Sequence, residues 1–310
     1  MKIKILMGLL ITTIIVFTGL MFIKTEETTK AISVKKVYSL VHSHLGEEFT
    51  IPILINKENS PYITQDFIFS IQITNNNEDI IIPLEITEIR QDSYTINIDS
   101  VTYYQFYIDC YINIESNDFD FVVNDAVVRI KYNDSSTIDF AIGEFNYIYK
   151  DLSSNHLSLH NLSADYKVIE GINTLSGINI ELFNKIDTSV IVKSIDIYSS
   201  SAITNNFYLR RIDDEFITFN EKLNVTTYNH LSDVNPYDQS ITISTSSSVL
   251  LFIPINYIGD IKYLNQFGIV VTYEISGVTY KMVIDDFLFM SSSPFKEEVS
   301  EYFDVHEITD

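Results

Sequence analysis

The chain has 310 residues with 42 acidic and 20 basic side chains, so its formal charge is −22, and 46% of its residues are hydrophobic. This hydrophobic content excludes a disordered polyelectrolyte, and the negative charge argues against nucleic-acid partners and against docking on anionic lipid. Cys110 is the single cysteine, which excludes an internal disulfide and the usual multi-cysteine zinc site.

The first 31 residues predict a signal-anchor or transmembrane segment. Residues 5–23 are uncharged and mostly apolar, and Lys2 and Lys4 precede them. A run of this length can span a bilayer, and the preceding lysines orient the N-terminus toward the cytoplasm. We therefore expect a single-pass cell-membrane protein with an N-terminal helix and an extracytoplasmic bulk. Cleavage near Ala31 would instead give a secreted protein.

The rest of the chain reads as β-strands. From residue 35 onward, short segments rich in Ile, Val, Tyr, Phe and Thr alternate with clusters of Asn, Asp, Ser and Gly. The clearest strand follows residue 100, where alternate positions predict a core face that includes Ile108, Cys110 and Ile112. Cys110 is therefore expected to be a small buried hydrophobe.

Two internal matches predict a duplicated unit. Residues 69–86 match 178–195, pairing Ile71 with Ile180, and residues 123–145 match 264–287, pairing Tyr132 with Tyr273. The first pair reads as strand, polar turn, strand, and the turns of the second pair are expected to close hairpins, so each pair is expected to occupy equivalent places in two copies of one strand order.

The fold class predicted from these observations is all-β. We expect two tandem immunoglobulin-like or fibronectin-like antiparallel β-sandwiches, a similarity of architecture that carries no family motif. The expected boundaries are an N-terminal segment 1–31, domain 32–150, a polar linker 151–163, domain 164–290 with an insertion at about 196–250, and an acidic tail 291–310.

The tail is expected to contain a short amphipathic helix. Pro294 opens it, and Phe295, Val299, Tyr302 and His306 fall on one helical face. Packing on the second sandwich is one reading of this helix, and binding a partner is the other.

Acidic clusters are the candidate metal ligands. Asp118, Asp120 and Asp125 offer the oxygen atoms that calcium prefers, although none has the spacing of a DxDxDG loop. A solvated acidic face explains the same residues, so the prediction is no obligatory cofactor, with calcium as the candidate ion.

The candidate ligand-binding residues lie on the outward face of the same strand as Cys110. They are Tyr103, Tyr107, Tyr111 and Asp109. Tyrosines at every fourth position can form a platform for an extended glycan or peptide, or they can be covered by a neighbouring part of the protein.

The favoured function is a membrane-tethered extracytoplasmic binding or scaffold protein of a bacterial cell surface, without enzymatic activity. Its expected partners are the membrane, through the N-terminal helix, and a surface protein or cell-wall glycan. One alternative is an accessory extracytoplasmic subunit of a membrane transporter or export system. The other is a surface glycoside hydrolase, whose two carboxylates would be hidden among the many acidic residues.

Overall fold

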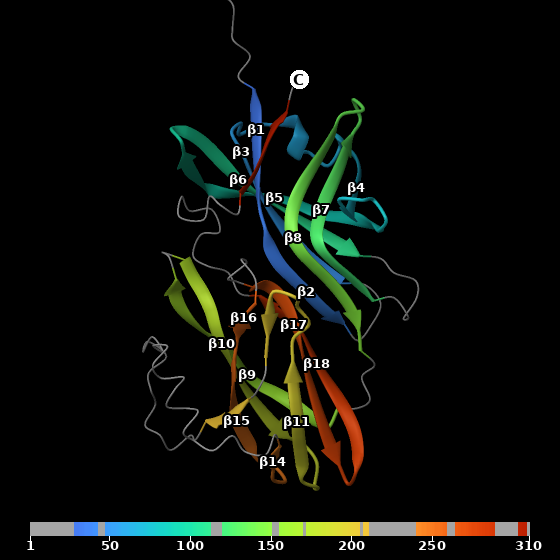
Figure 1. The fold of residues 1–310 in the computed structure, drawn as a ribbon, viewed down its shortest axis with the longest axis vertical. Helices are drawn as coiled ribbons and strands as arrows, with labels where there is room; N and C mark the ends of the chain where they lie inside the picture. The colour runs from blue at the N-terminus through green and yellow to red at the C-terminus, as the bar shows by residue number, and fades with distance from the viewer. Residues whose placement is uncertain are drawn as a thin grey trace, which may run out of the picture.

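The structure, a computed structural model, is nearly all β. It describes residues 28–42, 47–112, 120–150, 155–169, 172–204, 207–210, 240–258, 264–288 and 303–308. Within these ranges the one helical element is a 3-10 turn, η1 (Pro61–Ile63). The prediction of an all-β protein is confirmed. Figure 1 shows the strands gathered into two lobes, one above the other.

The N-terminal lobe contains the strands before residue 150 and the last strand of the chain. These are β1 (Thr29–Val34), β2 (Lys36–His42), β3 (Glu47–Ile55), β4 (Ile68–Asn75), β5 (Ile81–Ile98), β6 (Val101–Ile112), β7 (Phe121–Tyr132), β8 (Thr137–Tyr149) and β19 (Phe303–Ile308).

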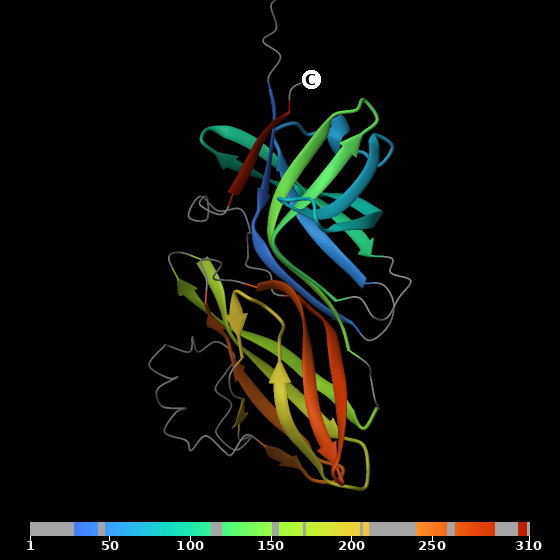
Figure 2. The same cartoon turned by 45° about the vertical axis from the view of Figure 1, so that its right-hand side comes forward.

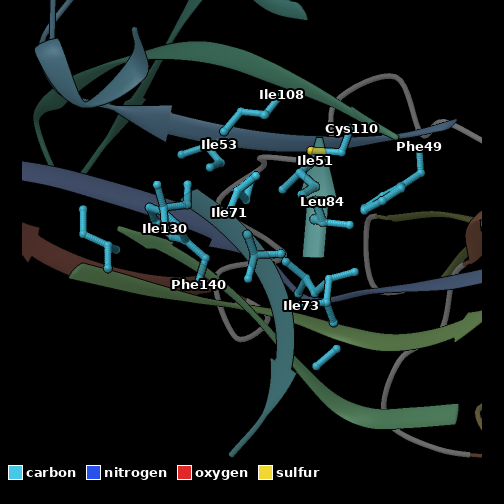
Figure 3. Packing of buried hydrophobic residues seen from close by; sticks show 14 of the residues in the cluster. Phe49, Ile51, Ile53, Ile71, Ile73, Leu84, Ile108, Cys110, Ile130 and Phe140 are labelled. Atoms are coloured by element: carbon cyan, nitrogen blue, oxygen red, sulfur yellow. The ribbon is translucent and has the colours of Figure 1, made fainter. Parts of the chain in front are cut away.

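The strands of the N-terminal lobe form two layers, β19-β1-β3-β6-β5 and β5-β4-β7-β8-β2. Strand β5 belongs to both layers, because its first part pairs with β4 and its later part pairs with β6. Apolar side chains from the two layers meet between them, as seen for Ile51, Ile73 and Cys110 in Figure 3. Alternation of apolar residues along each strand supplies this core.

The C-terminal lobe contains β9 (Leu157–Ile169), β10 (Ile172–Asn184), β11 (Val190–Asp196), β12 (Ala202–Ile203), β13 (Tyr208–Arg210), β14 (Ile241–Ile243), β15 (Ser248–Pro254), β16 (Asn256–Tyr257), β17 (Leu264–Ile275) and β18 (Val278–Leu288). Its layers are β13-β15-β10-β9 and β14-β11-β17-β18, and a second hydrophobic core lies between them. Strands β12 and β16 pair with each other.

Strand β2 joins the two lobes. It pairs in parallel with β8 of the N-terminal lobe and with β17 of the C-terminal lobe, so the second layers of both lobes form one continuous sheet. Tyr38 and Leu40 enter the core of the N-terminal lobe, whereas Val37 enters the core of the C-terminal lobe.

Two glycines allow the backbone of β2 to approach its neighbours closely. A Cβ on Gly143 of β8 would lie 2.2 Å from the carbonyl oxygen of Lys36, and a Cβ on Gly268 of β17 would lie 2.6 Å from the Cβ of Val41. Gly143 also has a φ of +99°, which side chains disfavour.

Hydrogen bonds fix a second contact between the lobes, around the buried Glu144 of β8. Its carboxylate accepts hydrogen bonds from the backbone N–H groups of Ser200 and Ser201, at 2.7 and 3.0 Å. The Ser199 and Ser200 hydroxyls donate to it as well. Nearby, Asn146 donates to the backbone carbonyl of Tyr198 at 3.1 Å.

Of the two internal matches, that of residues 123–145 with 264–287 predicts the strands correctly. The β7–β8 and β17–β18 hairpins are both present, and Tyr132 and Tyr273 are both buried. The residue match is looser. Aligning 123–145 with 264–287 sets Phe140 against Met282 and Val128 against Ile269, but Phe140 pairs with Val128 whereas Met282 pairs with Val271. The two hairpins have different turns and therefore different registers.

The other match does not predict the structure: residues 69–86 and 178–195 occupy different places in their lobes. Residues 69–86 form the β4–β5 hairpin within one layer, but the matching residues fall on β10 and β11, which lie in opposite layers of the C-terminal lobe. By its place in the layers, the counterpart of β4 is β11, and that of β10 is β3. A polar turn between two apolar strands can join strands within a layer or across layers, and the local pattern is the same in both cases.

The predicted linker and the predicted C-terminal helix also differ from the structure. Residues 157–163 of the predicted linker are part of β9. In the predicted C-terminal helix, residues 294–302 lie outside the described residues, while residues 303–308 form strand β19 on the N-terminal lobe instead of packing as a helix on the C-terminal lobe. Pairing with β1 overrides the helical spacing.

The predicted N-terminal helix over residues 5–23 lies outside the described residues. Among the residues that the structure describes, none forms a helix long and apolar enough to cross a membrane. The expected localisation as a single-pass membrane protein is therefore corrected: it finds no support in the structure.

Candidate functional site

Strand β6 has the two faces that its sequence predicts. Phe106, Ile108, Cys110 and Ile112 point into the core of the N-terminal lobe. Cys110 is fully buried, and its burial raises the pKa of the thiol far above its ordinary value. A thiol that stays protonated is a poor nucleophile, so Cys110 is a packing residue.

The opposite side of β6 carries a polar network, which we call the outer β6 face. It comprises Thr50 of β3, Arg90 of β5, and Tyr107, Asp109 and Tyr111 of β6, which the registers of β3–β6 and β5–β6 place side by side. Every one of these strands has its alternate residues in the core, so the network is held on a rigid layer.

Asp109 is the centre of this network. The guanidinium of Arg90 donates two hydrogen bonds to the carboxylate of Asp109, at 2.6 and 2.9 Å, and the Thr50 hydroxyl donates a third at 2.7 Å. Partial burial alone would raise the pKa of Asp109, but the hydrogen bonds from Arg90 and Thr50 outweigh it and hold the pKa below its usual value. Asp109 is therefore a carboxylate at neutral pH.

Tyr107 extends the network toward β5. The Arg90 guanidinium lies over its ring at 5.4 Å from the centroid. Gln105 donates a hydrogen bond to the Tyr107 hydroxyl at 2.5 Å, and that hydroxyl donates to Asp92 at 3.5 Å. Burial, followed by the negative charge of Asp92, raises the pKa of Tyr107, so the phenol stays protonated.

The three predicted tyrosines do not form one open platform. Tyr103 is buried with Ile32, Val34 and Leu54 in a small cluster on the outer side of the layer, and Phe303 of β19 packs against this cluster. Tyr107 and Tyr111 are only half-buried. The open part of the predicted site therefore consists of Tyr107, Asp109 and Tyr111, and Tyr103 belongs to a packed cluster.

Sequence reasoning missed the partners from the neighbouring strands. Thr50 and Arg90 sit on β3 and β5, and nothing in their local sequence connects them with Asp109. One signal was available: Arg90 is one of few basic residues in an acidic chain, and a cation on a strand among acidic neighbours favours an ion pair across the sheet.

Within the described residues, the candidate calcium ligands do not come together in one site. Asp118 lies outside the described residues, Asp120 accepts a hydrogen bond from the backbone N–H of Tyr149 at 2.8 Å, and Asp125 is exposed on β7. Among the described residues, no three His, Cys, Asp or Glu side chains come together as a metal site would require. Calcium binding at these residues stays a prediction.

Comparisons with known proteins give little. No protein-family model matches the chain, and no curated protein matches it. Among solved structures, it is similar to the C-terminal domain of the AgI/II polypeptide BspA of Streptococcus agalactiae, with 9% identity, a TM-score of 0.22, and coverage of 81% of this chain and 97% of that one.

Two further solved structures have similar scores. They are the YadV chaperone, with 10% identity, a TM-score of 0.19, and coverage of 82% and 98%, and the D00-D0 domain of intimin, with 9%, 0.19, 84% and 99%. Likenesses with such TM-scores decide neither the fold nor the function of this chain.

Proposed function

We propose that the chain is a non-enzymatic binding or scaffold protein of a bacterial cell surface, and that the outer β6 face holds its ligand. The ligand expected there is a surface protein or a cell-wall glycan. The single observation that supports this proposal is the preorganised network of Arg90, Asp109 and Thr50 between two half-buried tyrosines.

The fold that we propose for this function is two immunoglobulin-like sandwiches in tandem. In the C-terminal lobe the layers β9-β10-β15 and β18-β17-β11 follow the ABE and GFC strand orders of that architecture, and β13 and β14 extend them at the places of D and C′, although β13 precedes β14 in the chain. In the N-terminal lobe, β1-β3-β6-β5 and β8-β7-β4-β5 follow the same orders, with β2 added beside β8. Such sandwiches present side chains on rigid layers, as a binding protein requires.

The chemistry of the face fits recognition of a polar, extended ligand. Aromatic rings with polar tips supply contact area at a low entropic cost, and the flanking carboxylate and guanidinium are already oriented by each other. Because Arg90 neutralises Asp109, a ligand need not carry a compensating charge. Glycan hydroxyls or peptide amides can then exchange hydrogen bonds with the rim of the network.

The experiment compares alanine variants at the two open tyrosines. Purified bacterial cell-wall glycan and a crosslinked extract of surface proteins serve as the two probes. We expect Tyr111→Ala and Tyr107→Ala to weaken binding to one of them by about tenfold or more. Tyr280→Ala, a half-buried tyrosine of the C-terminal lobe, is the matched control and should leave binding unchanged.

The proposal fails if the Tyr107→Ala variant unfolds at a lower temperature but binds both probes as well as the unmodified chain does. That result would make the tyrosines packing residues only. No contact among the described residues favours a transporter subunit or a glycoside hydrolase.

A further inference from the structure

Strand β19 lies on a different lobe from the described strand that precedes it in the chain. Strand β19 follows β18 of the C-terminal lobe, yet it pairs antiparallel with β1 of the N-terminal lobe, from Val34↔Phe303 to Thr29↔Ile308. Figures 1 and 2 both show this short red strand beside the blue β1 at the far end of the molecule. In the described part of the chain, β1 is its only strand partner.

Side chains of β19 are recognised at alternating positions. On the inner side, Ile308 is buried in the core of the N-terminal lobe, and His306 contacts the Phe140 ring edge-on at 5.1 Å. Asp304 accepts a hydrogen bond from the backbone N–H of Ala141 at 2.8 Å, so it caps an edge of β8 that β2 does not cover.

The outer side of β19 makes two further contacts. Phe303 packs on the cluster of Ile32, Val34, Leu54 and Tyr103, and Glu307 forms an ion pair with Lys30 at 3.3 Å. Val305 is 55% exposed. The strand is therefore held by a backbone ladder and by side-chain contacts on both of its faces, which is how proteins recognise an added β-strand.

The seat of β19 is built almost entirely without it. Strand β1 also pairs with β3, from Ala31↔Ile55 to Ser33↔Ile53. Among the described buried residues in the core of the N-terminal lobe, Ile308 is the only one that comes from beyond residue 147. The edge of β1, together with Phe140 and Ala141 of β8, is thus formed by the rest of the lobe, and β19 is an element added to it; we call this place the β1 edge.

We propose that the β1 edge is a strand-acceptor site and that its ligand, besides the chain's own β19, is the β19 segment of a second copy. An identical strand makes the same six-residue ladder and the same side-chain contacts whichever copy supplies it. The choice between the two is then set by the effective concentration of the chain's own strand against the concentration of other copies. Each exchange links two copies through Phe303–Ile308.

The test uses two single-cysteine variants of the full chain, Lys30→Cys and Glu307→Cys. Neither can form the 30–307 disulfide with a partner of its own kind, and the native Cys110 is buried. After the two are mixed at high concentration and mildly oxidised, we expect disulfide-linked heterodimers, about tenfold more abundant than dimers of either variant alone. Raising the ionic strength should increase their yield, because it screens the repulsion between copies of charge −22.

Three controls decide what a crosslink means. A mixture of Lys30→Cys with Val278→Cys, an exposed residue at the far tip of the C-terminal lobe, measures random collision. Adding Ile308→Asp to the Glu307→Cys copy should remove the heterodimer, because the buried side chain is lost. Adding Val305→Asp to that copy should preserve it, because Val305 is exposed.

Two results overturn the proposal. One is a heterodimer yield no higher than the collision control after incubation at a temperature just below unfolding. The other is a heterodimer yield that Ile308→Asp does not reduce, since crosslinking would then not depend on binding of β19 at the β1 edge. A double variant carrying both cysteines in one chain should close its disulfide within the monomer, which verifies the geometry of the pair independently of exchange.

Discussion

The two lobes share three strands in each layer, β1-β3-β6 with β9-β10-β15 and β8-β7-β4 with β18-β17-β11, but they differ in their first strand. In the N-terminal lobe the first strand divides at Lys35: β1 stays in one layer and β2 crosses to the other. In the C-terminal lobe β9 runs without division and pairs only with β10. As a result, the last strand of the N-terminal lobe, β8, has a second partner in β2, whereas β18 pairs only with β17 among the described strands.

This difference changes how deeply side chains on the last strand of each lobe, β8 and β18, are buried. Ile138, Phe140 and Ile142 of β8 are all nearly inaccessible, at 7%, 1% and 1% exposure. On β18, Tyr280 and Met282 are only half-buried. The N-terminal lobe therefore gains its closure from β1, β2 and β19, and the same β2 attaches the C-terminal lobe. Strand β2 thus both helps to close the N-terminal lobe and joins it to the C-terminal lobe.

The largest effect is expected from crowding β2. Gly143→Ala places a Cβ 2.2 Å from the Lys36 carbonyl oxygen at a φ of +99°, and we expect it to destabilise the protein by about 2–5 kcal/mol. Gly277→Ala in the C-terminal hairpin has a positive φ but no atom within 4 Å of the added Cβ, so about 1 kcal/mol is expected. Chemical denaturation measures both. Equal losses would mean that β2 can shift without cost.

The second prediction concerns Lys36, the first residue of β2. It is buried, and burial lowers its pKa to about 7. Between pH 7 and the ordinary lysine pKa of about 10.4, the unfolded chain binds a proton that the folded chain lacks, so this residue makes stability rise with pH in that window. Lys36→Met should raise stability at pH 7 by about 2–4 kcal/mol and flatten the rise. Lys131→Met, at an exposed position on β7, is the control. An unchanged slope in the Lys36→Met variant would contradict the assignment.

The third prediction tests whether the lobes unfold together. Glu144→Gln replaces a carboxylate that accepts two backbone N–H groups of the other lobe, and a loss of about 2 kcal/mol is expected. Calorimetry should show one transition in the unmodified chain and a broader or split transition in the variant. Glu88→Gln, an exposed carboxylate of the N-terminal lobe, should change neither. A single sharp transition in Glu144→Gln would show that β2 alone couples the lobes.

The smallest effect is expected from the surface ion pairs. Asp109→Asn breaks a bidentate, partly buried pair with Arg90 and should cost about 0.5–1 kcal/mol at pH 7. Because the folded pKa of Asp109 is lowered, this contribution is present above the unfolded pKa and disappears as the pH falls through the folded pKa. The pair Lys193–Glu274 in the C-terminal lobe makes a single 3.2 Å contact, and Glu274→Gln should cost about 0.3 kcal/mol or less. Urea titrations at pH 7 and pH 3 measure both.

Several parts of the structure could be predicted from the sequence because they depend on neighbouring residues. Alternation along β6 predicts that Cys110 is buried and that Asp109 is not, and the turns after Tyr132 and Ile275 predict their hairpins. For the outer β6 face, the sequence predicted only the residues on β6 itself. Arg90 and Thr50 reach Asp109 through pairings with β5 and β3, whose registers no local pattern contains.

By itself, the sequence determined most of the strands, such as β6, and which of their sides is apolar, since side chains on a strand alternate between its two faces. It did not determine the layer in which a strand lies. The β10–β11 segment crosses between layers, and residues 303–308 form a strand on a distant lobe despite a helical spacing. Only the tertiary structure decides these points, because the free energy that stabilises a strand in one place comes from backbone pairing and burial against residues that are remote in the chain.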